Sequence, residues 1–233
     1  ANRKLVGNIA DIHFAPTDIN VNNLLKENYP KEKIIKCGNT VIDALYWVKK
    51  NKSKDIEEIK KKYGVDGKKY ILITMHRREN WGKPMEETLK AVRDYLEKHK
   101  DIYLVFPMHL NPLVRNTAHK VLDGFERKIL IEPLEYLEFI AIMDGAHYIM
   151  TDSGGVQEEA PSLGKPTLVL RDTTERPEAI EAGTAKLTGT KYEDVIKDME
   201  LLEGETYEKM SKANNPYGDG RTSERIRKYL ETI

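Results

Sequence analysis

The sequence has few of the residues that build several common kinds of functional site. Its single cysteine, Cys37, excludes an intrachain disulfide framework and a zinc site made of cysteines. Its longest apolar runs, such as residues 70–75 and 102–108, are too short to span a bilayer. Its first residues, Ala-Asn-Arg-Lys, include no apolar signal region. We therefore expect a cytoplasmic protein with no membrane insertion.

The sequence also lacks an excess of charge of either sign, since 38 Lys and Arg residues balance 38 Asp and Glu residues. This balance gives no overall attraction to nucleic acid, although it is compatible with a local anion site. The motifs HExxH, GxSxG, GxGxxG and the P-loop are all missing. The sequence therefore lacks the signatures of metal-dependent hydrolases, serine hydrolases, P-loop ATPases and Rossmann dehydrogenases. With 39% hydrophobic residues, the chain can still bury a sizeable core. We expect a globular protein that binds neither nucleic acid nor metal.

From Lys69 onward, short apolar runs alternate with charged segments of helical spacing. Nearly continuous apolar runs are typical of strands covered on both faces. The predicted strands are residues 70–75, 102–108, 128–132, 148–151, 167–170 and 185–187. The predicted helices are residues 85–99, 113–122, 136–143, 155–162, 177–182 and 192–202. This alternation predicts an α/β fold with a Rossmann-like, doubly wound parallel sheet.

The part of the chain before Lys69 is too small to form a domain alone. It offers two short strands, 13–15 and 33–36, and helices at 20–27 and 41–51. We interpret residues 1–38 as the end of an N-terminal Rossmann-like domain, residues 39–222 as a complete C-terminal one, and residues 223–233 as a helix that packs back on the first domain.

Four polar segments follow predicted strands, where ligands bind in doubly wound sheets. In the first, residues 74–82, His76 can act as an acid, as a base or as a hydrogen-bond donor to phosphate. Arg77 and Arg78 can bind phosphate oxygens. The alternative is a solvated loop in which Glu79 pairs with an arginine. Such a segment alone does not decide between the two.

The second segment, residues 151–159, ends a strand, turns through Ser153–Gly155 and begins a helix. Glycines let the backbone approach a ligand closely, and amides at a helix start suit a phosphate. Alternatively, Ser153 only caps the helix. Glu159 is well placed to accept hydrogen bonds from ribose hydroxyls, unless it lies on a solvated helix face.

The third segment, residues 171–178, is a dense polar loop with Arg176 just before a proline, which suits anion contact or an exposed salt-bridged turn. The fourth, residues 106–112, contains His109, which is either a ligand contact or a capping residue. For the remaining histidines we expect structural roles: His13, His99, His119 and His147.

The combination of these segments resembles the non-hydrolysing UDP-N-acetylglucosamine 2-epimerase family in order and spacing. The matching motifs are 76–80 (HRREN), 106–112 (FPxHLNP), 152–161 (DSGGxQEEAP), 171–178 (RDTTERPE), 38–43 (GNTVID) and 215–220 (NPYGDG). The resemblance covers essentially the whole chain. It implies a glycosyltransferase-B-like architecture, in which two Rossmann-like domains enclose the substrate, and a homodimer.

The resemblance also implies roles for individual residues. His76 is the catalytic histidine, and Ser153, Gly154 and Gly155 hold the diphosphate. Glu159 contacts the ribose and Arg176 a further part of the nucleotide sugar. Phe139 and the backbone near Leu134 border the uracil. Arg77 and His109 match an allosteric site at which relatives bind a second UDP-GlcNAc.

The chemistry implied by the resemblance needs no cofactor. UDP is eliminated across carbons 1 and 2 of UDP-GlcNAc, giving 2-acetamidoglucal, and its re-addition yields UDP-ManNAc for polysaccharide biosynthesis. The family's other catalytic carboxylates lie before the position of Ala1, so we expect these 233 residues alone to bind UDP weakly without epimerising. Three alternatives remain: a hydrolysing epimerase that releases ManNAc, a related glycosyltransferase, and a non-catalytic nucleotide-sugar sensor.

Overall fold

The computed structural model describes residues 2–233, so that Ala1, the first residue of the predicted domain end, lies outside the described residues. The chain divides into two compact units. The small unit comprises the described residues up to Trp47 together with Asn215–Ile233. The large unit is Val48–Asn214. The domain bounds expected at residues 38/39 and 222/223 remain a prediction.

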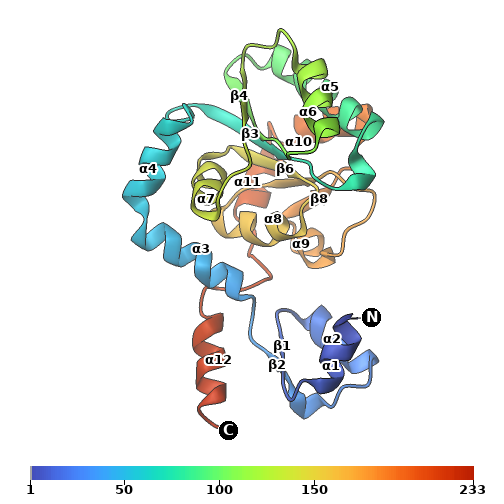
Figure 1. Cartoon of the computed structure of the whole chain (residues 1–233), viewed down its shortest axis with the longest axis vertical. Helices are drawn as coiled ribbons and strands as arrows, with labels where there is room; N and C mark the ends of the chain where they lie inside the picture. Colours follow the sequence, from blue (N-terminus) through green and yellow to red (C-terminus); the bar gives the residue numbers. More distant parts are fainter. Residues whose placement is uncertain (1) are drawn as a thin grey trace. The chain divides into compact units, whose positions relative to one another are not determined.

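The large unit is built on one parallel sheet of six strands in the order β5-β4-β3-β6-β7-β8 (Figure 1). Every neighbouring pair of strands is parallel. The strands are β3 (Lys69–Thr74), β4 (Ile102–Pro107), β5 (Lys128–Ile131), β6 (Tyr148–Thr151), β7 (Thr167–Val169) and β8 (Ala185–Leu187). Each lies within a residue of its predicted bounds, which confirms the predicted doubly wound α/β fold.

Helices follow the strands along the chain, as predicted. They are α5 (Lys83–Lys98), α6 (Pro112–Leu122), α7 (Tyr136–Gly145), α8 (Gly154–Glu159), α9 (Pro177–Glu181) and α10 (Tyr192–Leu201). The helix predicted at 155–162 is wrong beyond Glu159, where a 3-10 helix, η3 (Ala160–Leu163), takes over. Pro161 lacks the amide hydrogen that a continuing α-helix would need.

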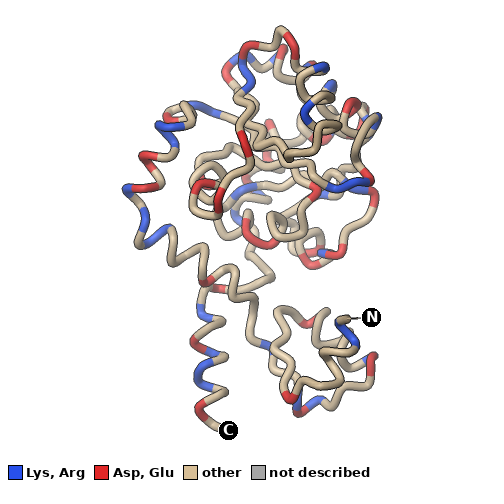
Figure 2. The backbone as a smooth tube through the Cα atoms, in the orientation of Figure 1, with Lys and Arg blue, Asp and Glu red and all other residues tan. Residues whose placement is uncertain are grey.

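Two helices of the large unit were not predicted, α4 (Ser53–Lys62) and α11 (Glu205–Ser211). Ile56 is the buried residue of α4, and Met210 is that of α11. Figure 2 shows that most residues along α4 are acidic or basic. Each segment has few apolar positions, so the sequence offers little apolar stripe from which to recognise a helix.

The two faces of the sheet pack against different helices because side chains alternate along each strand. Ile71 and Ile73 of β3 belong to the main hydrophobic cluster, which also contains buried residues of α5, α6 and α10. Tyr70 points to the other face, where its hydroxyl donates a hydrogen bond of 2.5 Å to the carbonyl oxygen of Ile142 in α7. Helices therefore cover both faces of the sheet. The polar segments that follow the strands lie at the carboxyl edge of the sheet.

The small unit contains a two-stranded parallel sheet of β1 (His13–Ala15) and β2 (Ile34–Lys36). Its helices are α1 (Asn2–Ile9), α2 (Asp18–Lys26), η1 (Lys31–Lys33), the first part of α3 (Thr40–Asn51) and α12 (Thr222–Leu230).

The small unit brings together the motifs at 38–43 and 215–220. The Asn39 amide donates to the carbonyl oxygen of Tyr217 at 2.7 Å. The Asp43 carboxylate accepts hydrogen bonds from the amides of Thr222 and Ser223, at 3.0 and 2.7 Å. Asp43 therefore caps the start of α12 from a distant part of the sequence.

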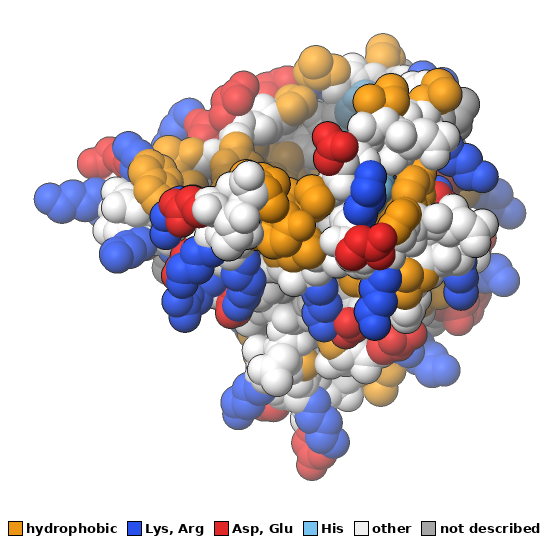
Figure 3. All heavy atoms as spheres, turned by 90° about the horizontal axis from the view of Figure 1, so that it is seen from below, with side chains coloured by type: hydrophobic (Ala, Val, Ile, Leu, Met, Phe, Trp, Pro, Cys, Tyr) orange, Lys and Arg blue, Asp and Glu red, His pale blue; other side chains and the backbone are white. Residues whose placement is uncertain are grey.

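Charges of both signs are spread over the surface. Figure 3 shows Lys and Arg side chains interspersed with Asp and Glu side chains over the viewed face, in keeping with the formal net charge of zero. Among residues 2–233, no helix has the length and apolar character needed to cross a membrane.

Candidate functional site

The sheet has one position where the direction of chain progression reverses. Strand β3 lies between β4 and β6, so the connections that leave β3 and β6 run toward opposite edges. Thr74 and Thr151, the last residues of these strands, are register partners and lie within hydrogen-bonding distance, 2.6 Å between hydroxyl oxygens. Ligands of doubly wound sheets bind at such a switch point. The segments with His76 and Ser153 both start here.

Asp152 occupies the centre of this switch point and is wholly buried. Its carboxylate accepts hydrogen bonds from the backbone amides of His76 and Arg77, both at 3.0 Å, and from the side-chain amide of Asn80 at 2.9 Å. Burial alone would raise the pKa of the Asp152 carboxyl, but the bonds from His76, Arg77 and Asn80 outweigh it, so this pKa lies below its ordinary value. The buried carboxylate therefore stays ionised.

The imidazole of His76 rests against this carboxylate. Its Nδ1 lies 2.9 Å from Oδ1 of Asp152, and the side chain is 46% exposed. The hydrogen bond to Asp152 raises the pKa of His76, while burial and the nearby charge of Arg77 oppose the rise. His76 thus sits half-exposed at the switch point, as a group that can gain or lose a proton near neutral pH.

Ser153, Gly154 and Gly155 follow Asp152 directly and start α8. Ser153 occupies the N-cap position but makes no side-chain capping bond, so simple capping does not account for its hydroxyl. A Cβ atom added to Gly154 would lie 3.7 Å from the Arg176 guanidinium, which places Arg176 beside this turn. The Arg176 guanidinium also pairs with Glu158. The structure therefore brings Ser153, Gly154 and Arg176 together.

Glu159 lies at the end of α8 and is only 6% exposed, so it does not lie on a solvated helix face. Burial and the charge of Glu158 raise the pKa of Glu159, against the hydrogen bond that it accepts from Tyr136. That bond is 2.8 Å long and reaches Glu159 from the first residue of α7. Leu134 and Phe139, the predicted neighbours of uracil, flank Tyr136 in the sequence and are both half-buried.

Arg77 is turned inward. Its Nε donates to the carbonyl oxygen of Asp152 at 2.8 Å, and its guanidinium reaches Glu175 at 3.4 Å. Arg171, 8% exposed, bonds Glu175 at 2.7 Å and Glu79 at 3.0 Å. The partner of Glu79 is thus Arg171, and the loops that follow β3 and β7 are tied together by charged hydrogen bonds.

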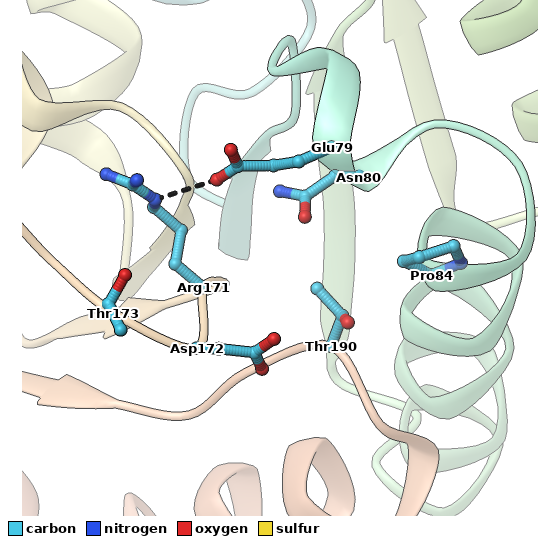
Figure 4. A pocket seen from close by; sticks show the side chains of 7 residues that line it. All are labelled: Glu79, Asn80, Pro84, Arg171, Asp172, Thr173 and Thr190. Carbon is cyan, nitrogen blue, oxygen red and sulfur yellow. Dashed lines mark hydrogen bonds and ion pairs between the residues drawn. The ribbon is translucent and has the colours of Figure 1, made fainter.

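A polar pocket of about 300 Å³ opens beside these loops. Figure 4 shows Arg171 and Glu79 on one side of it and Pro84 on the opposite side. Its lining residues are Glu79, Asn80, Pro84, Arg171, Asp172, Thr173 and Thr190.

His109 lies on the loop after β4 and is not brought to Asp152 by any hydrogen bond. Its Nδ1 accepts a hydrogen bond of 3.2 Å from the Asn111 amide, and its ring centroid lies 6.4 Å from that of Trp81. His109 therefore forms a local turn beside the 76–82 loop. Three other histidines pack against tyrosine rings: His13 on Tyr29, His99 on Tyr95 and His147 on Tyr207.

Sequence reasoning assigned no role to Asp152, Asn80 or Tyr136, which the structure places in hydrogen bonds with the site. For Asp152 a signal exists, because a carboxylate directly after a largely apolar strand must be satisfied or exposed. Nothing comparable marks Tyr136, whose partner Glu159 is 23 residues away. In the described part of the chain, no group of three or more His, Cys, Asp or Glu side chains is placed to hold a metal ion.

A family model described as UDP-N-acetylglucosamine 2-epimerase matches residues 1–231 of the chain. The UDP-N-acetylglucosamine 2-epimerase of Bacillus subtilis (strain 168) is 52% identical over 228 residues, which are 97% of this chain and 59% of the relative. That of Escherichia coli (strain K12) is 48% identical over 238 residues, 99% of this chain and 63% of the relative. The chain thus spans less than two thirds of the length of these relatives.

Two solved structures give the same picture. The UDP-GlcNAc 2-epimerase of Neisseria meningitidis bound to UDP-GlcNAc is 44% identical, with a TM-score of 0.91. The MnaA–UDP structure from S. aureus is 47% identical, with a TM-score of 0.90. Each match covers 100% of this chain and 64% of the other. The similarity confirms the predicted α/β fold of the glycosyltransferase-B-like type.

Proposed function

Because the chain belongs to the UDP-N-acetylglucosamine 2-epimerase family, we propose that the protein is a non-hydrolysing epimerase that interconverts UDP-GlcNAc and UDP-ManNAc. The observation that carries this proposal is the position of His76 beside Asp152, directly before the Ser153–Gly155 turn, at the switch point of the sheet. The chain spans 59% and 63% of two such relatives, so turnover is proposed for the whole protein.

The large unit supplies groups for both ends of the nucleotide. The hydroxyl of Ser153 and the backbone of Gly154 and Gly155 contact the diphosphate, and Arg176 neutralises part of the charge of the nucleotide sugar. Glu159 accepts hydrogen bonds from the ribose. The face between Leu134 and Phe139 borders the uracil, with the backbone near Leu134 as the polar contact.

The proposed reaction is an elimination followed by a re-addition. A base removes the proton from carbon 2 while the bond between carbon 1 and the diphosphate oxygen breaks, so that UDP and 2-acetamidoglucal result. UDP then adds back to carbon 1, and carbon 2 receives a proton on the opposite face. Hydrogen-bond donors that hold the departing diphosphate lower the barrier to this step. His76 acts in proton transfer or on the leaving group.

The assembly and the setting are part of the proposal. We expect a cytoplasmic homodimer that contributes to polysaccharide biosynthesis and uses no redox cofactor. Arg77 and His109 are proposed to contact a second UDP-GlcNAc. The inward bonds of Arg77 to Asp152 and Glu175 would then have to be exchanged in part for contacts with that ligand.

Proton NMR of UDP-GlcNAc in heavy water tests the function. Deuterium at carbon 2 together with UDP-ManNAc supports the non-hydrolysing epimerase, and free ManNAc identifies the hydrolysing branch instead. An acceptor requirement for loss of UDP-GlcNAc identifies a glycosyltransferase. Broadened uracil signals without exchange are expected if the 233 residues are only the binding part. The absence of both signals, with no exchange at carbon 2 and no broadening of the uracil protons, would overturn the proposal.

Two variants locate the binding site in the same experiment. Ser153→Ala and Glu159→Gln remove proposed contacts and are each expected to weaken UDP binding by about tenfold, the equivalent of one or two hydrogen bonds. Glu138→Gln is a matched control, because Glu138 lies on α7 and pairs with Lys62 at 2.6 Å. Equal UDP affinity in all three variants would contradict the assigned site.

A further inference from the structure

The hydrogen-bond donors to the Asp152 carboxylate all come from one short loop, residues 76–80. Oδ2 accepts from the amides of His76 and Arg77 and from the side chain of Asn80, while Oδ1 lies 2.9 Å from Nδ1 of His76. A buried carboxylate surrounded in this way is retained in its charged form. Its two oxygens face the backbone and the imidazole of the same residue, His76.

The charge of Asp152 decides which ring nitrogen of His76 carries the proton. An ionised carboxylate can only accept hydrogen bonds, so Nδ1 must be the donor in the 2.9 Å contact. In the neutral imidazole the other nitrogen, Nε2, then holds the lone pair. Since the Nδ1 side of the half-exposed ring rests on Asp152, the Nε2 side is the one that it offers to a ligand.

We propose that Asp152 is a positioning residue for His76, fixing its Nδ1–H tautomer and its ring orientation so that Nε2 is the nitrogen presented to substrate. The presence of substrate at Nε2 rests on the proposed function, whereas the tautomer and the orientation do not. Asp152 itself touches no reacting atom. It acts through the imidazole, in the way that outer carboxylates orient histidines in other sites.

Asn80 extends this arrangement to a third strand. Its side-chain amide donates to Oδ2 of Asp152 at 2.9 Å and to the carbonyl oxygen of Leu170, after β7, at 3.0 Å. Asn80 is itself only 4% exposed. Asn80 therefore holds the carboxylate at Oδ2, the oxygen that does not face Nδ1 of His76, and the ring of His76 cannot rotate without breaking its bond to a fixed partner.

Two charged groups face His76, and they act in opposite directions. Asp152 favours the imidazolium, whereas the guanidinium of Arg77 disfavours it. Arg77 is in turn bound to the carbonyl oxygen of Asp152 and to Glu175. The Asp152 bond prevails, which keeps the pKa of His76 above its ordinary value.

The first test uses the unaltered chain. Long-range ¹H–¹⁵N NMR of the imidazole, in a pH titration, reports which nitrogen of His76 is protonated. Above the pKa of His76 we expect a protonated Nδ1 and an unprotonated Nε2, and the pKa to lie above that of an exposed histidine. A ring with its proton on Nε2 overturns the proposal without any variant.

The second test replaces Asp152 by asparagine. The amide of Asp152→Asn can still accept from the backbone, but it then offers an N–H to Nδ1. We expect His76 to switch to the Nε2–H tautomer and its pKa to fall. Asp198→Asn is the matched control, since Asp198 is a buried aspartate on α10 that faces Lys186. An unchanged tautomer and pKa in Asp152→Asn mean that Asp152 only anchors the loop, which overturns the proposal.

The two hypotheses fail in different ways. The NMR signals of His76 need no substrate, so they test the positioning role even if UDP-GlcNAc is not turned over. If the tautomer switches in Asp152→Asn but the unaltered protein neither binds UDP nor exchanges carbon 2, the proposed function fails and the positioning role stands.

Discussion

The phenol hydroxyl of Tyr136 donates a hydrogen bond of 2.8 Å to Oε1 of Glu159. Glu159 ends α8 and Tyr136 begins α7, so this bond joins two helices that follow different strands. Burial raises the pKa of Glu159, and the hydrogen bond from Tyr136 opposes this rise by stabilising the charged carboxylate. The same bond fixes the orientation of the carboxylate. The proposed ribose contact therefore depends on Tyr136.

We predict that Tyr136→Phe weakens UDP binding by about three- to tenfold, because losing one hydrogen bond to a buried carboxylate costs about 1 kcal/mol. Isothermal titration calorimetry with UDP measures this change. Tyr63→Phe is the control, since the Tyr63 hydroxyl donates to Glu138, on the same helix α7, at 2.9 Å. Equal losses in both variants would argue against a specific role of Tyr136.

We predict that Gly154→Ala weakens UDP binding by about fivefold or more without loss of stability. The nearest atoms that the added Cβ meets belong to the Arg176 guanidinium, at an ordinary distance of 3.7 Å, so the fold tolerates it. A diphosphate that approaches the backbone would lose that space. Thermal unfolding and UDP titration of the same variant separate the two effects.

Gly38→Ala is the opposite case and completes that comparison. Gly38 has a φ of +94°, and an added Cβ would lie 2.5 Å from the Thr222 hydroxyl oxygen. We expect a loss of stability of about 1 kcal/mol or more. A Gly154→Ala variant that unfolds as readily as Gly38→Ala would show that Gly154 is needed for structure.

We predict that Asp43→Ala loosens α12 selectively. Its carboxylate caps the helix through the amides of Thr222 and Ser223, and removing such a cap costs about 0.5–2 kcal/mol. Hydrogen exchange should accelerate in residues 222–230 and stay unchanged in β3, β4 and β6. Faster exchange throughout the sheet would contradict a local capping role.

We predict that His147 destabilises the fold in mild acid. Burial, followed by the charge of Lys69, lowers the pKa of His147 to about 4, from 6.5. Between these values the unfolded chain binds a proton that the folded chain does not. The stability present above pH 6.5 is therefore lost as the pH falls toward 4.

His147→Gln tests this dependence, since glutamine does not titrate. Urea unfolding at several values between pH 7 and pH 4 should show a smaller loss of stability in the variant than in the unaltered chain. His119→Gln is the control. The same slope in all three proteins would contradict the assignment to His147.

The sequence predicted the sheet well because its strands are buried on both faces. Runs such as residues 70–75 are nearly continuously apolar, and such runs leave few alternatives to a central parallel strand. Helices α4 and α11 were missed because each buries little apolar surface. In the structure α4 packs against α7, and α11 packs against α10.

The site was predictable only in part. His76, Ser153 and Glu159 stand in polar segments after strands, which is a local pattern. The bonds of Arg171 to Glu79 and of Arg77 to Glu175 are not local, because in each pair one partner lies in the loop after β3 and the other in the loop after β7. A charged residue in a loop has many possible partners, and the strand order selects among them.

By itself the sequence determined the alternation of strands and helices, and with it which polar segments lie at the carboxyl edge of the sheet. This follows from the periodicity of the apolar residues, which is a property of the chain. Only the tertiary structure decided that β3 and β6 are neighbours and that Asp152 therefore faces Nδ1 of His76. Strand order depends on how the helices share the two faces of the sheet, and that is settled by packing between segments far apart in the sequence.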